Sequence, residues 1–469
     1  MAVAKKYLWM LLFQIPIIVA IPSCSKEEQV SKPNIIFILA DDLGYGDLGC
    51  YGQQIIKTPN IDNLAYDGMR FTQYYAGSPV CSPSRSVLMT GQHTGHTTVR
   101  GNKCKVGGTV GYKRDREVRR MNLLDDDVTV AQVLRNAGYK TCLVGKWHLG
   151  GYNPDAGPLN RGFDEFYGGL SRTFNYHQPP YWPPNWFNND ELVDIPENQN
   201  GQMGYYRTDI NTDNAINFIE RNRKNPFLLY LSFSIPHSPF DAPDFGPYVN
   251  KEWPNEEKTY AAMIHHLDLS VGRVMESLER LNLDEKTIVF FSSDNGPRSE
   301  GTDLQTRVIN FFNSNGNLRG YKRDLYEGGI RVPMIVRWPG KISKSKTNDA
   351  VCYFADFLPT AADLASTKPP DNIDGISMWP SLINNSNEMN DRFLYWEYFG
   401  RGFQQAVRWK NWKAIRFKPE EPLLLFDLSQ DLYEENNVAN KHSEIIEQIE
   451  DYLQTARTES PNWPLEKLH

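Results

Sequence analysis

The stretch of sequence that decides the fold is Pro33-Asn34-Ile35-Ile36-Phe37-Ile38-Leu39-Ala40-Asp41-Asp42. Its middle is a continuous apolar run, which is typical of a central parallel strand buried on both faces. It ends in two aspartates, and open α/β sheets carry their sites at the carboxyl ends of such strands. The stretch therefore predicts an α/β sheet and also the edge of that sheet where function resides.

Similar apolar runs alternate with helical patterns along the next 350 or so residues, which predicts a large, mostly parallel mixed sheet sandwiched by helices. The expected strands are residues 33–40, 70–75, 140–144, 227–233, 287–291 and 331–338. The expected helices are one that starts at Thr58-Pro59 and those at 128–136, 211–222, 259–281 and 352–365. Residues 174–200 are rich in proline and aromatic residues, so we expect no regular structure there.

The pattern changes near the C-terminus. Short strands are expected at residues 392–398, 406–409 and 412–416, followed by a helix at 442–455. We therefore expect a catalytic domain over residues 33–385 and a small C-terminal α+β domain, with a short antiparallel sheet, over residues 386–469.

Charge limits the partners of the chain. Its 469 residues carry a formal net charge of −7, which argues against nucleic acid as a partner. An anionic substrate would need a local cluster of Lys and Arg. The six cysteines show no zinc-ribbon spacing, although an exported chain could pair two of them.

The N-terminus resembles a bacterial lipoprotein signal. Lys5 and Lys6 precede the apolar run Tyr7 to Ala20, which is short for a membrane span and leads to Ile21-Pro22-Ser23-Cys24. We expect a signal peptide over residues 1–24, a lipid on Cys24 and a tether over residues 25–32. The protein would then be exported to the periplasm or to the outer membrane and cell surface, touching a membrane only through the lipid. An ordinary secretory signal cut nearby is the alternative.

Polar residues follow the expected strands at the same edge of the sheet. Asp41, Asp42, Asp294 and Asn295 are hard oxygen ligands that suit Ca²⁺ or Mg²⁺ better than Zn²⁺. A second group consists of cations or proton carriers: Arg85, Lys146, His148, His237 and Lys322. A divalent cation surrounded by basic groups is what a tetrahedral oxyanion such as sulfate or phosphate requires.

A short motif stands among these residues: Cys81-Ser82-Pro83-Ser84-Arg85. The proline fixes the backbone just after the cysteine. If a helix begins here, the arginine lies one turn along, and its guanidinium can return to the cysteine side.

Together these motifs resemble the formylglycine-dependent sulfatases, the arylsulfatase-like branch of the alkaline phosphatase superfamily. The resemblance covers nearly all of residues 33–440. It rests on the first strand with Asp41-Asp42, the Cys81 motif, Gly145-Lys146-Trp147-His148-Leu149-Gly150, Ser293-Asp294-Asn295-Gly296, and Leu318-Arg319-Gly320-Tyr321-Lys322 with the following Tyr326 to Pro333. It implies an alkaline phosphatase-like fold and the hydrolysis of sulfate esters with release of inorganic sulfate.

The resemblance also implies the chemistry of Cys81. A separate sulfatase-maturating enzyme would oxidise it to Cα-formylglycine, whose hydrate attacks sulfur and then expels sulfate. The implied ligands of a Ca²⁺ ion are Asp41, Asp42, the modified Cys81, Asp294 and Asn295. The implied catalytic roles are diol stabilisation by Arg85, sulfate binding by Lys146 and Lys322, deprotonation of the diol by His148, and protonation of the leaving oxygen by His237 with help from Lys322.

Candidates for substrate contacts are Arg100, Asn102, His177, Trp182 and Arg401. The export signal and the aromatic loops favour a sulfated polysaccharide or its oligosaccharides as substrate. A galactose or N-acetylgalactosamine sulfate is favoured by a general likeness to glycosaminoglycan-type sulfatases. Two alternatives remain, a phosphoesterase of the same superfamily and a non-catalytic lipoprotein that binds sulfated glycans.

Overall fold

The protein is described by a computed structural model over residues 32–113, 116–150, 153–170, 180–299, 303–384, 389 and 391–465. The predicted signal peptide, most of the tether and the candidate substrate residue His177 lie outside these described residues.

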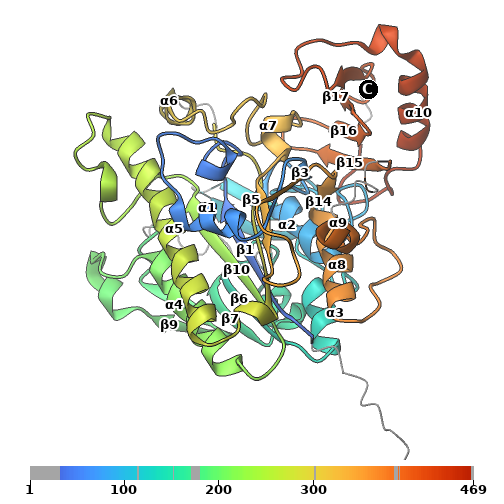
Figure 1. The fold of residues 1–469 in the computed structure, drawn as a ribbon. Coiled ribbons are helices and arrows are strands. Elements are labelled where there is room, and N and C mark those ends of the chain that lie inside the picture. The colour runs from blue at the N-terminus through green and yellow to red at the C-terminus, as the bar shows by residue number, and fades with distance from the viewer. Residues whose placement is uncertain are drawn as a thin grey trace, which may run out of the picture. The chain divides into compact units, whose positions relative to one another are not determined.

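The strand predicted first lies at the centre of a ten-stranded sheet (Figure 1). β1 (Asn34–Asp41) pairs in parallel with β10 (Phe227–Pro236) on one side and β11 (Thr287–Ser293) on the other. The parallel strands β6 (Lys140–Lys146) and β7 (Glu165–Gly169) continue the sheet beyond β10. Four predicted strands therefore end at one edge of the sheet.

The outer strands make the sheet mixed. Its order is β13-β2-β12-β11-β1-β10-β6-β7-β8-β9. β12 is antiparallel to β11 and to β2, while β8 and β9 form an antiparallel hairpin. The outer strands are β2 (Met69–Phe71), β8 (Asn185–Asn188), β9 (Glu191–Asp194), β12 (Met334–Arg337) and β13 (Lys346–Asn348).

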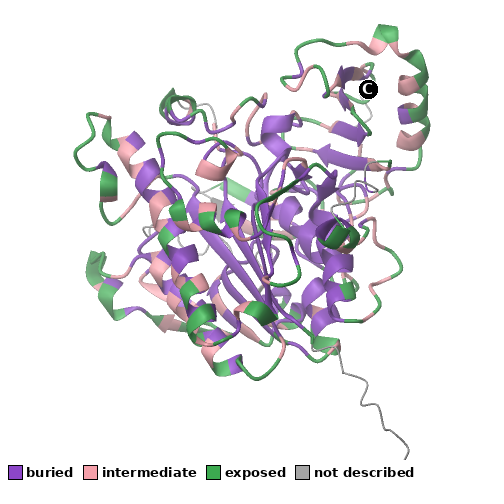
Figure 2. Ribbon diagram, viewed as in Figure 1, coloured by how far each residue is buried: buried purple, intermediate pink, exposed green. Residues whose placement is uncertain are grey.

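Helices cover both faces of the sheet, so the strands between them are buried (Figure 2). Ile35, Phe37 and Leu39 of β1 face one apolar core, and the residues between them face the other, which explains the continuous apolar run. The first core takes residues of α2 (Cys81–Thr90), α3 (Val130–Asn136) and α8 (Phe357–Leu364). The second core takes residues of α1 (Pro59–Tyr66), α4 (Arg207–Asn222) and α5 (Asn255–Arg280).

A four-stranded antiparallel sheet follows near the C-terminus, as predicted. Its strands are β15 (Phe393–Tyr398), β16 (Gln404–Trp409), β17 (Trp412–Arg416) and β18 (Leu424–Asp427), and α10 (Ser443–Leu453) packs with them. Trp396 of β15 lies in the first apolar core and donates from Nε1 to the carbonyl of Ala76 at 2.8 Å. The boundary between the two predicted domains stays a prediction.

Two expectations about local structure were wrong. Residues 352–365 are not one helix, because the chain pairs first as β14 (Cys352–Tyr353) with β3 (Tyr74–Tyr75). Pro359 explains the late start of α8, since its ring excludes helical backbone four residues earlier. The described part of residues 174–200 contains the β8–β9 hairpin, whose turn uses Asn189 at a φ of 57°.

No secondary structure was predicted for residues 109–120. β4 (Thr109–Lys113) and β5 (Arg116–Arg120) form a hairpin there. Three further helices complete the described part of the chain: α6 (Asp303–Phe311), α7 (Glu327–Ile330) and α9 (Trp379–Asn384).

The described cysteines are free thiols, so none of the five forms a disulfide with another: Cys50, Cys81, Cys104, Cys142 and Cys352. Within the described ranges, no helix is both long enough and apolar enough to cross a membrane.

Candidate active site

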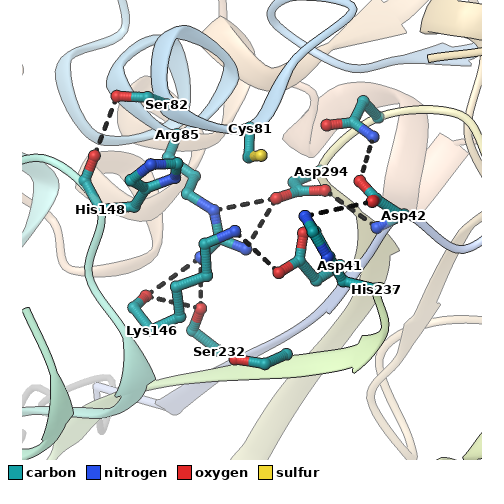
Figure 3. A network of polar contacts seen from close by, with 12 residues as sticks. Asp41, Asp42, Cys81, Ser82, Arg85, Lys146, His148, Ser232, His237 and Asp294 are labelled. Atoms are coloured by element: carbon teal, nitrogen blue, oxygen red, sulfur yellow. Dashed lines mark hydrogen bonds and ion pairs between the residues drawn. The ribbon is translucent and has the colours of Figure 1, made fainter. Parts of the chain in front are cut away.

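The carboxyl ends of four neighbouring strands bring the predicted site residues together (Figure 3). Asp41 is the last residue of β1 and Lys146 the last of β6, while Asp294 and His237 follow β11 and β10. Gly145 allows the end of β6 to lie close to β10. Its φ is 106°, and a side chain there would meet the carbonyl of Ser232 at 2.0 Å.

Arg85 is the fully buried centre of this group. Its Nε and Nη2 donate to Asp294 Oδ2 at 2.9 and 2.7 Å, and its Nη1 donates to the carbonyl of Lys146 at 3.0 Å and to Ser232 Oγ. Burial alone would lower the pKa of Arg85, but the charge of Asp294 outweighs it and raises that pKa. The guanidinium is therefore a fixed positive charge one helical turn beyond Cys81.

Two lysines pair with the two aspartates that end β1. Lys146 Nζ donates to Asp41 Oδ2 at 2.7 Å, and Lys322 Nζ donates to Asp42 Oδ1 at 2.5 Å. Burial acts to raise the pKa of Asp41, but Lys146 and Arg85 outweigh it and hold that pKa well below its usual range. The Asp41 carboxylate therefore stays ionised and holds Lys146 in place.

Cys81 lies where these cations converge. It is the first residue of α2 and is 2% exposed. Lys322 Nζ is 3.4 Å from its Sγ, and Asn102 Nδ2 is 3.9 Å away. The N-terminus of a helix favours an anion in front of it, and here two side-chain donors point to the same place.

Several buried oxygens of the site have no hydrogen-bond partner among the described residues: Asp41 Oδ1, Asp42 Oδ2 and Asn295 Oδ1. Orphaned buried oxygens are costly unless a cation satisfies them. Asp41, Asp42, Cys81 and His237 each offer a ligand atom, and these atoms lie within 4.8 Å of one another. The carboxylate and amide oxygens fit a hard divalent cation such as Ca²⁺.

His148 contributes a neutral ring. Its backbone has a φ of 64°, and its Nε2 accepts a hydrogen bond from Arg120 Nη1 at 2.9 Å. Burial, followed by the charges of Lys146 and Arg120, holds the pKa of His148 well below its ordinary value. The imidazole is therefore uncharged at neutral pH, and Arg120 occupies its Nε2.

His237 lies across the carboxylates from His148 (Figure 3). Its Nε2 is 3.5 Å from Asp42 Oδ2, and its Nδ1 is 2.6 Å from the carbonyl of Ser238. A carbonyl only accepts, so Nδ1 carries a hydrogen and Nε2 faces the site.

Comparison with known sequences identifies the protein family of the chain. The family model described as Sulfatase matches residues 33–367, more than two thirds of the chain. The chain belongs to the sulfatase family. It is thus an enzyme that hydrolyses sulfate esters, as the sequence predicted. A second family model, described as N-sulphoglucosamine sulphohydrolase, C-terminal, matches residues 319–459 of the sulfatase.

Curated relatives agree with this assignment. The sulfatase is 30% identical to steryl-sulfatase of Mus musculus, over 89% of this chain and 81% of the mouse protein. It is 31% identical to N-acetylgalactosamine-6-sulfatase of Canis lupus familiaris, over 81% of this chain and 71% of the dog protein.

Solved structures of similar proteins confirm the predicted fold class. Ps i-CgsB, solved in complex with k-i-k-neocarrahexaose, has a TM-score of 0.79 and 32% identity, covering 93% of this chain and 95% of its own. A second structure, BT33336S-sulf, comes from a study of glycosaminoglycan metabolism by Bacteroides thetaiotaomicron. It has a TM-score of 0.75 and 27% identity. It covers 91% of this chain and 100% of its own.

The residues predicted to contact substrate have different surroundings in the sulfatase. Arg100 is buried and donates to Glu397 Oε1 at 3.0 Å, and Trp182 is buried and donates to Asp241 Oδ2 at 3.0 Å. These contacts hold the fold together. Asn102 lies beside Cys81, and Arg401 is exposed. Substrate roles for all four stay predictions.

Two residues of the site were missed from the sequence. Ser232 donates to the carbonyl of Lys146 at 2.8 Å and contacts Arg85, so it joins β6 to α2. A serine inside the apolar run of β10 was a visible signal of a polar contact. Arg120 gave no such signal, because Arg116-Glu117-Val118-Arg119-Arg120 resembles any charged surface segment.

Proposed function

We propose that this sulfatase hydrolyses sulfate esters of sulfated glycans, with Cys81 converted to formylglycine and Ca²⁺ at the neighbouring carboxylates. The observation that carries the proposal is Cys81 at the first turn of a buried helix, 3.4 Å from Lys322 Nζ and beside orphaned carboxylate oxygens. An unmodified thiol has little use for a lysine and several carboxylates around it. A bound sulfate group needs the basic side chains to offset its negative charge.

Formylglycine would supply the nucleophile, and calcium would withdraw charge from the sulfate group. In converted protein, the aldehyde hydrate at position 81 supplies an oxygen nucleophile that no unmodified side chain provides. A calcium ion bound by Asp41, Asp42, Asp294 and Asn295 would draw charge from the sulfate oxygens. The orphaned oxygens of Asp41, Asp42 and Asn295 support three members of this ligand set.

The side chains of the site then divide the remaining work. Lys146 and Lys322 bind the sulfate oxygens and offset the charge that develops on them. His237, protonated on both ring nitrogens, delivers the Nε2 proton to the leaving oxygen, and His148, held neutral, accepts a proton from the group at position 81. Arg85 keeps that group oriented, since it is fixed by Asp294.

The choice of a glycan rests on the similar proteins. A relative at 31% identity is an N-acetylgalactosamine-6-sulfatase, and a structure at 32% identity was solved with a neocarrahexaose. A galactose or N-acetylgalactosamine sulfate is accordingly the favoured ester. The steryl-sulfatase relative makes a steroid sulfate the natural comparison substrate.

Rates of sulfate release test the substrate class. We expect N-acetylgalactosamine-6-sulfate or galactose-4-sulfate to give a higher kcat/KM than dehydroepiandrosterone sulfate, and 4-nitrophenyl sulfate to be hydrolysed faster than 4-nitrophenyl phosphate. A preference for the phosphate ester would instead identify a phosphoesterase, and binding of sulfated glycans without any sulfate release would identify a binding protein.

Mass spectrometry of the peptide that contains residue 81 tests the conversion. Protein purified from its native host should carry the aldehyde or its hydrate at this position. An unmodified thiol in active native protein would contradict the proposal. Protein made without a maturating enzyme is unsuitable, because a retained thiol there reports only missing conversion.

The proposed location follows from the N-terminal sequence. Lys5, Lys6 and the apolar run before Cys24 support export as a lipoprotein, held in the periplasm or at the outer membrane. In the native host, metabolic labelling with a fatty acid should mark the wild type but not Cys24→Ala. Labelling of both would place the lipid elsewhere, and labelling of neither would support an ordinary secretory signal.

A further inference from the structure

An open cavity of about 530 Å³ lies beside the loop that carries Asn102. Its walls include the half-buried rings Phe399, Phe403 and Phe417, together with Trp463. Four cationic residues also line it: Lys103, Lys105, Arg401 and Lys418. None of them belongs to the group of residues around Cys81.

The cavity is joined to the active site through one short loop. Asn102 accepts a hydrogen bond from the backbone of Ser82 at 2.9 Å and approaches Cys81, while the next residue, Lys103, already lines the cavity. Consecutive Cα atoms are only about 3.8 Å apart, so the two sites adjoin. Gly101 lets the loop lie close to Trp463 of the cavity wall, because a side chain at this position would meet the ring of Trp463 at 3.0 Å.

A second connection runs along the other wall. Arg401 Nη1 donates to Asp324 Oδ1 at 2.8 Å, and Asp324 is two residues after Lys322. Lys322 Nζ in turn lies 3.4 Å from Cys81 Sγ. One wall of the cavity therefore lies one residue from Asn102, and another is joined by the Arg401–Asp324 pair to a segment two residues from Lys322. The two places are close enough for one oligosaccharide to reach both.

The charge of the cavity favours an anion. Of its described lining residues, four are cationic and Glu420 is the one carboxylate, although the whole chain has a net charge of −7. Arg401 pairs with Asp324 and Lys418 pairs with Glu421, both in partly exposed pairs. Water and salt screen such pairs strongly, so an anionic ligand can compete for these cations.

The rings add a second requirement. Phe399 lies 5.4 Å from Phe403 and 5.3 Å from Trp463 between ring centres, so the aromatic residues form one continuous wall. A free inorganic anion gains nothing from an apolar wall, whereas the C–H face of a sugar ring can pack on it. The combination fits a sugar ring that carries a negative group.

From these observations we infer that the cavity is a subsite for a second anionic sugar, sulfated or uronic, of the same glycan chain whose sulfate ester is cleaved at residue 81. The inference rests on the proposed function. It makes the sulfatase an enzyme that prefers multiply charged oligosaccharides to single sulfated sugars.

The test compares one sulfated sugar with an oligosaccharide that contains it. Suitable pairs are N-acetylgalactosamine-6-sulfate with a chondroitin-6-sulfate tetrasaccharide, and galactose-4-sulfate with a κ-neocarrahexaose. For the wild type, kcat/KM should be higher for the oligosaccharide, and the advantage should shrink as salt is raised.

The variant Lys103→Gln/Lys105→Gln removes two exposed cations of the cavity, and Lys57→Gln/Lys251→Gln removes two exposed lysines that do not line it. The first should lower the oligosaccharide-to-monosaccharide ratio of kcat/KM about tenfold, mainly through KM, as expected for the loss of one charge-assisted contact. The second should leave the ratio as it is.

The outcomes separate the two proposals. If the wild type releases sulfate from both members of a pair with equal kcat/KM, or if both double variants behave alike, the subsite is refuted and the proposed function stands. If the wild type releases sulfate from no sulfated sugar, the proposed function fails and the subsite with it.

Discussion

Single residues decide the chemistry of this sulfatase, and Cys81 is the first to test. Cys81→Ala should abolish sulfate release, because no other side chain of the site takes the place of the converted cysteine. The fold should remain, since the change removes only one sulfur atom, and thermal unfolding should show it. Cys50→Ala, at a half-buried thiol outside the site, is the matched control. Normal turnover by Cys81→Ala would place the nucleophile elsewhere.

Arg120 controls the proton affinity of His148. In its proposed role as base, His148 works when its ring is neutral, so activity should fall as the pH drops through its pKa. Arg120→Gln removes a nearby positive charge and should raise the pKa of His148, although burial still holds it down. The acid limb of kcat should therefore move to higher pH. Arg119→Gln, next in the chain but exposed and paired with Glu117, should not move it. An unmoved limb for Arg120→Gln would contradict this role for His148.

Asp294 belongs to the proposed metal site and also pairs with Arg85. Asp294→Ala should lose bound calcium, and it should lower the free energy of unfolding by about 3–5 kcal/mol because it leaves Arg85 buried without its partner. Asn295→Ala removes a candidate ligand but keeps that ion pair, so it should lose calcium with less loss of stability. Elemental analysis and denaturant unfolding measure both effects, and the exposed Asp155→Ala is the control. Retained calcium in both site variants would refute the ligand set.

At the scale of elements, a buried charge cluster joins β17 to the loop that carries Lys322. Lys413 Nζ of β17 donates to Glu327 Oε1 at 2.9 Å and to Glu434 Oε1 at 3.4 Å. Glu434 also accepts from the backbone of Glu327 at 2.7 Å, and burial raises the pKa of Glu434 to about 7. The small sheet thereby fixes the segment from Arg319 to Glu327, in which Lys322 lies.

Lys413→Met should therefore be costly, since Glu434 loses its buried cation and Glu327 keeps only its pair with Arg331. We expect a loss of about 3–5 kcal/mol in unfolding free energy and a lower kcat, because Lys322 becomes less well positioned. Lys410→Met, in the same β-hairpin but half exposed, should cost less than about 1 kcal/mol. Equal losses from the two variants, measured by denaturant unfolding, would show that the cluster does not stabilise the fold.

The elements also show what sequence could predict. Buried strands such as β1 and β11 were found because an uninterrupted apolar run of strand length, bounded by polar residues, is characteristic of a strand covered on both faces. The β4–β5 hairpin was missed because residues 109–120 show no alternation of apolar and polar residues. Likewise, helical spacing of apolar residues from Cys352 onward hid the fact that Pro359 forbids a helix that starts so early.

The strand-end residues were predictable for a topological reason, since parallel strands must end at one edge. Contacts that depend on a chance approach between distant segments were not. The position of Arg120 beside His148, and the burial of Arg100 against Glu397, follow from packing that no local pattern encodes.

At the scale of the molecule, the small sheet is tied closely to the rest of the protein. Leu394 and Trp396 share an apolar core with Phe37 of β1, and Glu397 is paired with Arg100. A chain that ends at residue 385 should therefore expose this core and fail to give soluble, cooperatively unfolding protein. Calorimetry of the full chain should show one transition. A stable, active fragment of residues 33–385 would instead support independent domains.

The burial of Cys81 implies that its proposed conversion precedes the folding of the chain. With 2% of its surface exposed and Arg85 locked to Asp294 behind it, residue 81 is closed to any enzyme of protein size once α2 is packed. Under the proposed conversion, a maturating enzyme must act on a chain whose later strands are not yet in place. Asp294 lies more than 200 residues downstream, so the interval lasts at least as long as the synthesis or export of that length. Competition between conversion and folding, rather than catalysis, would then set the yield of active enzyme.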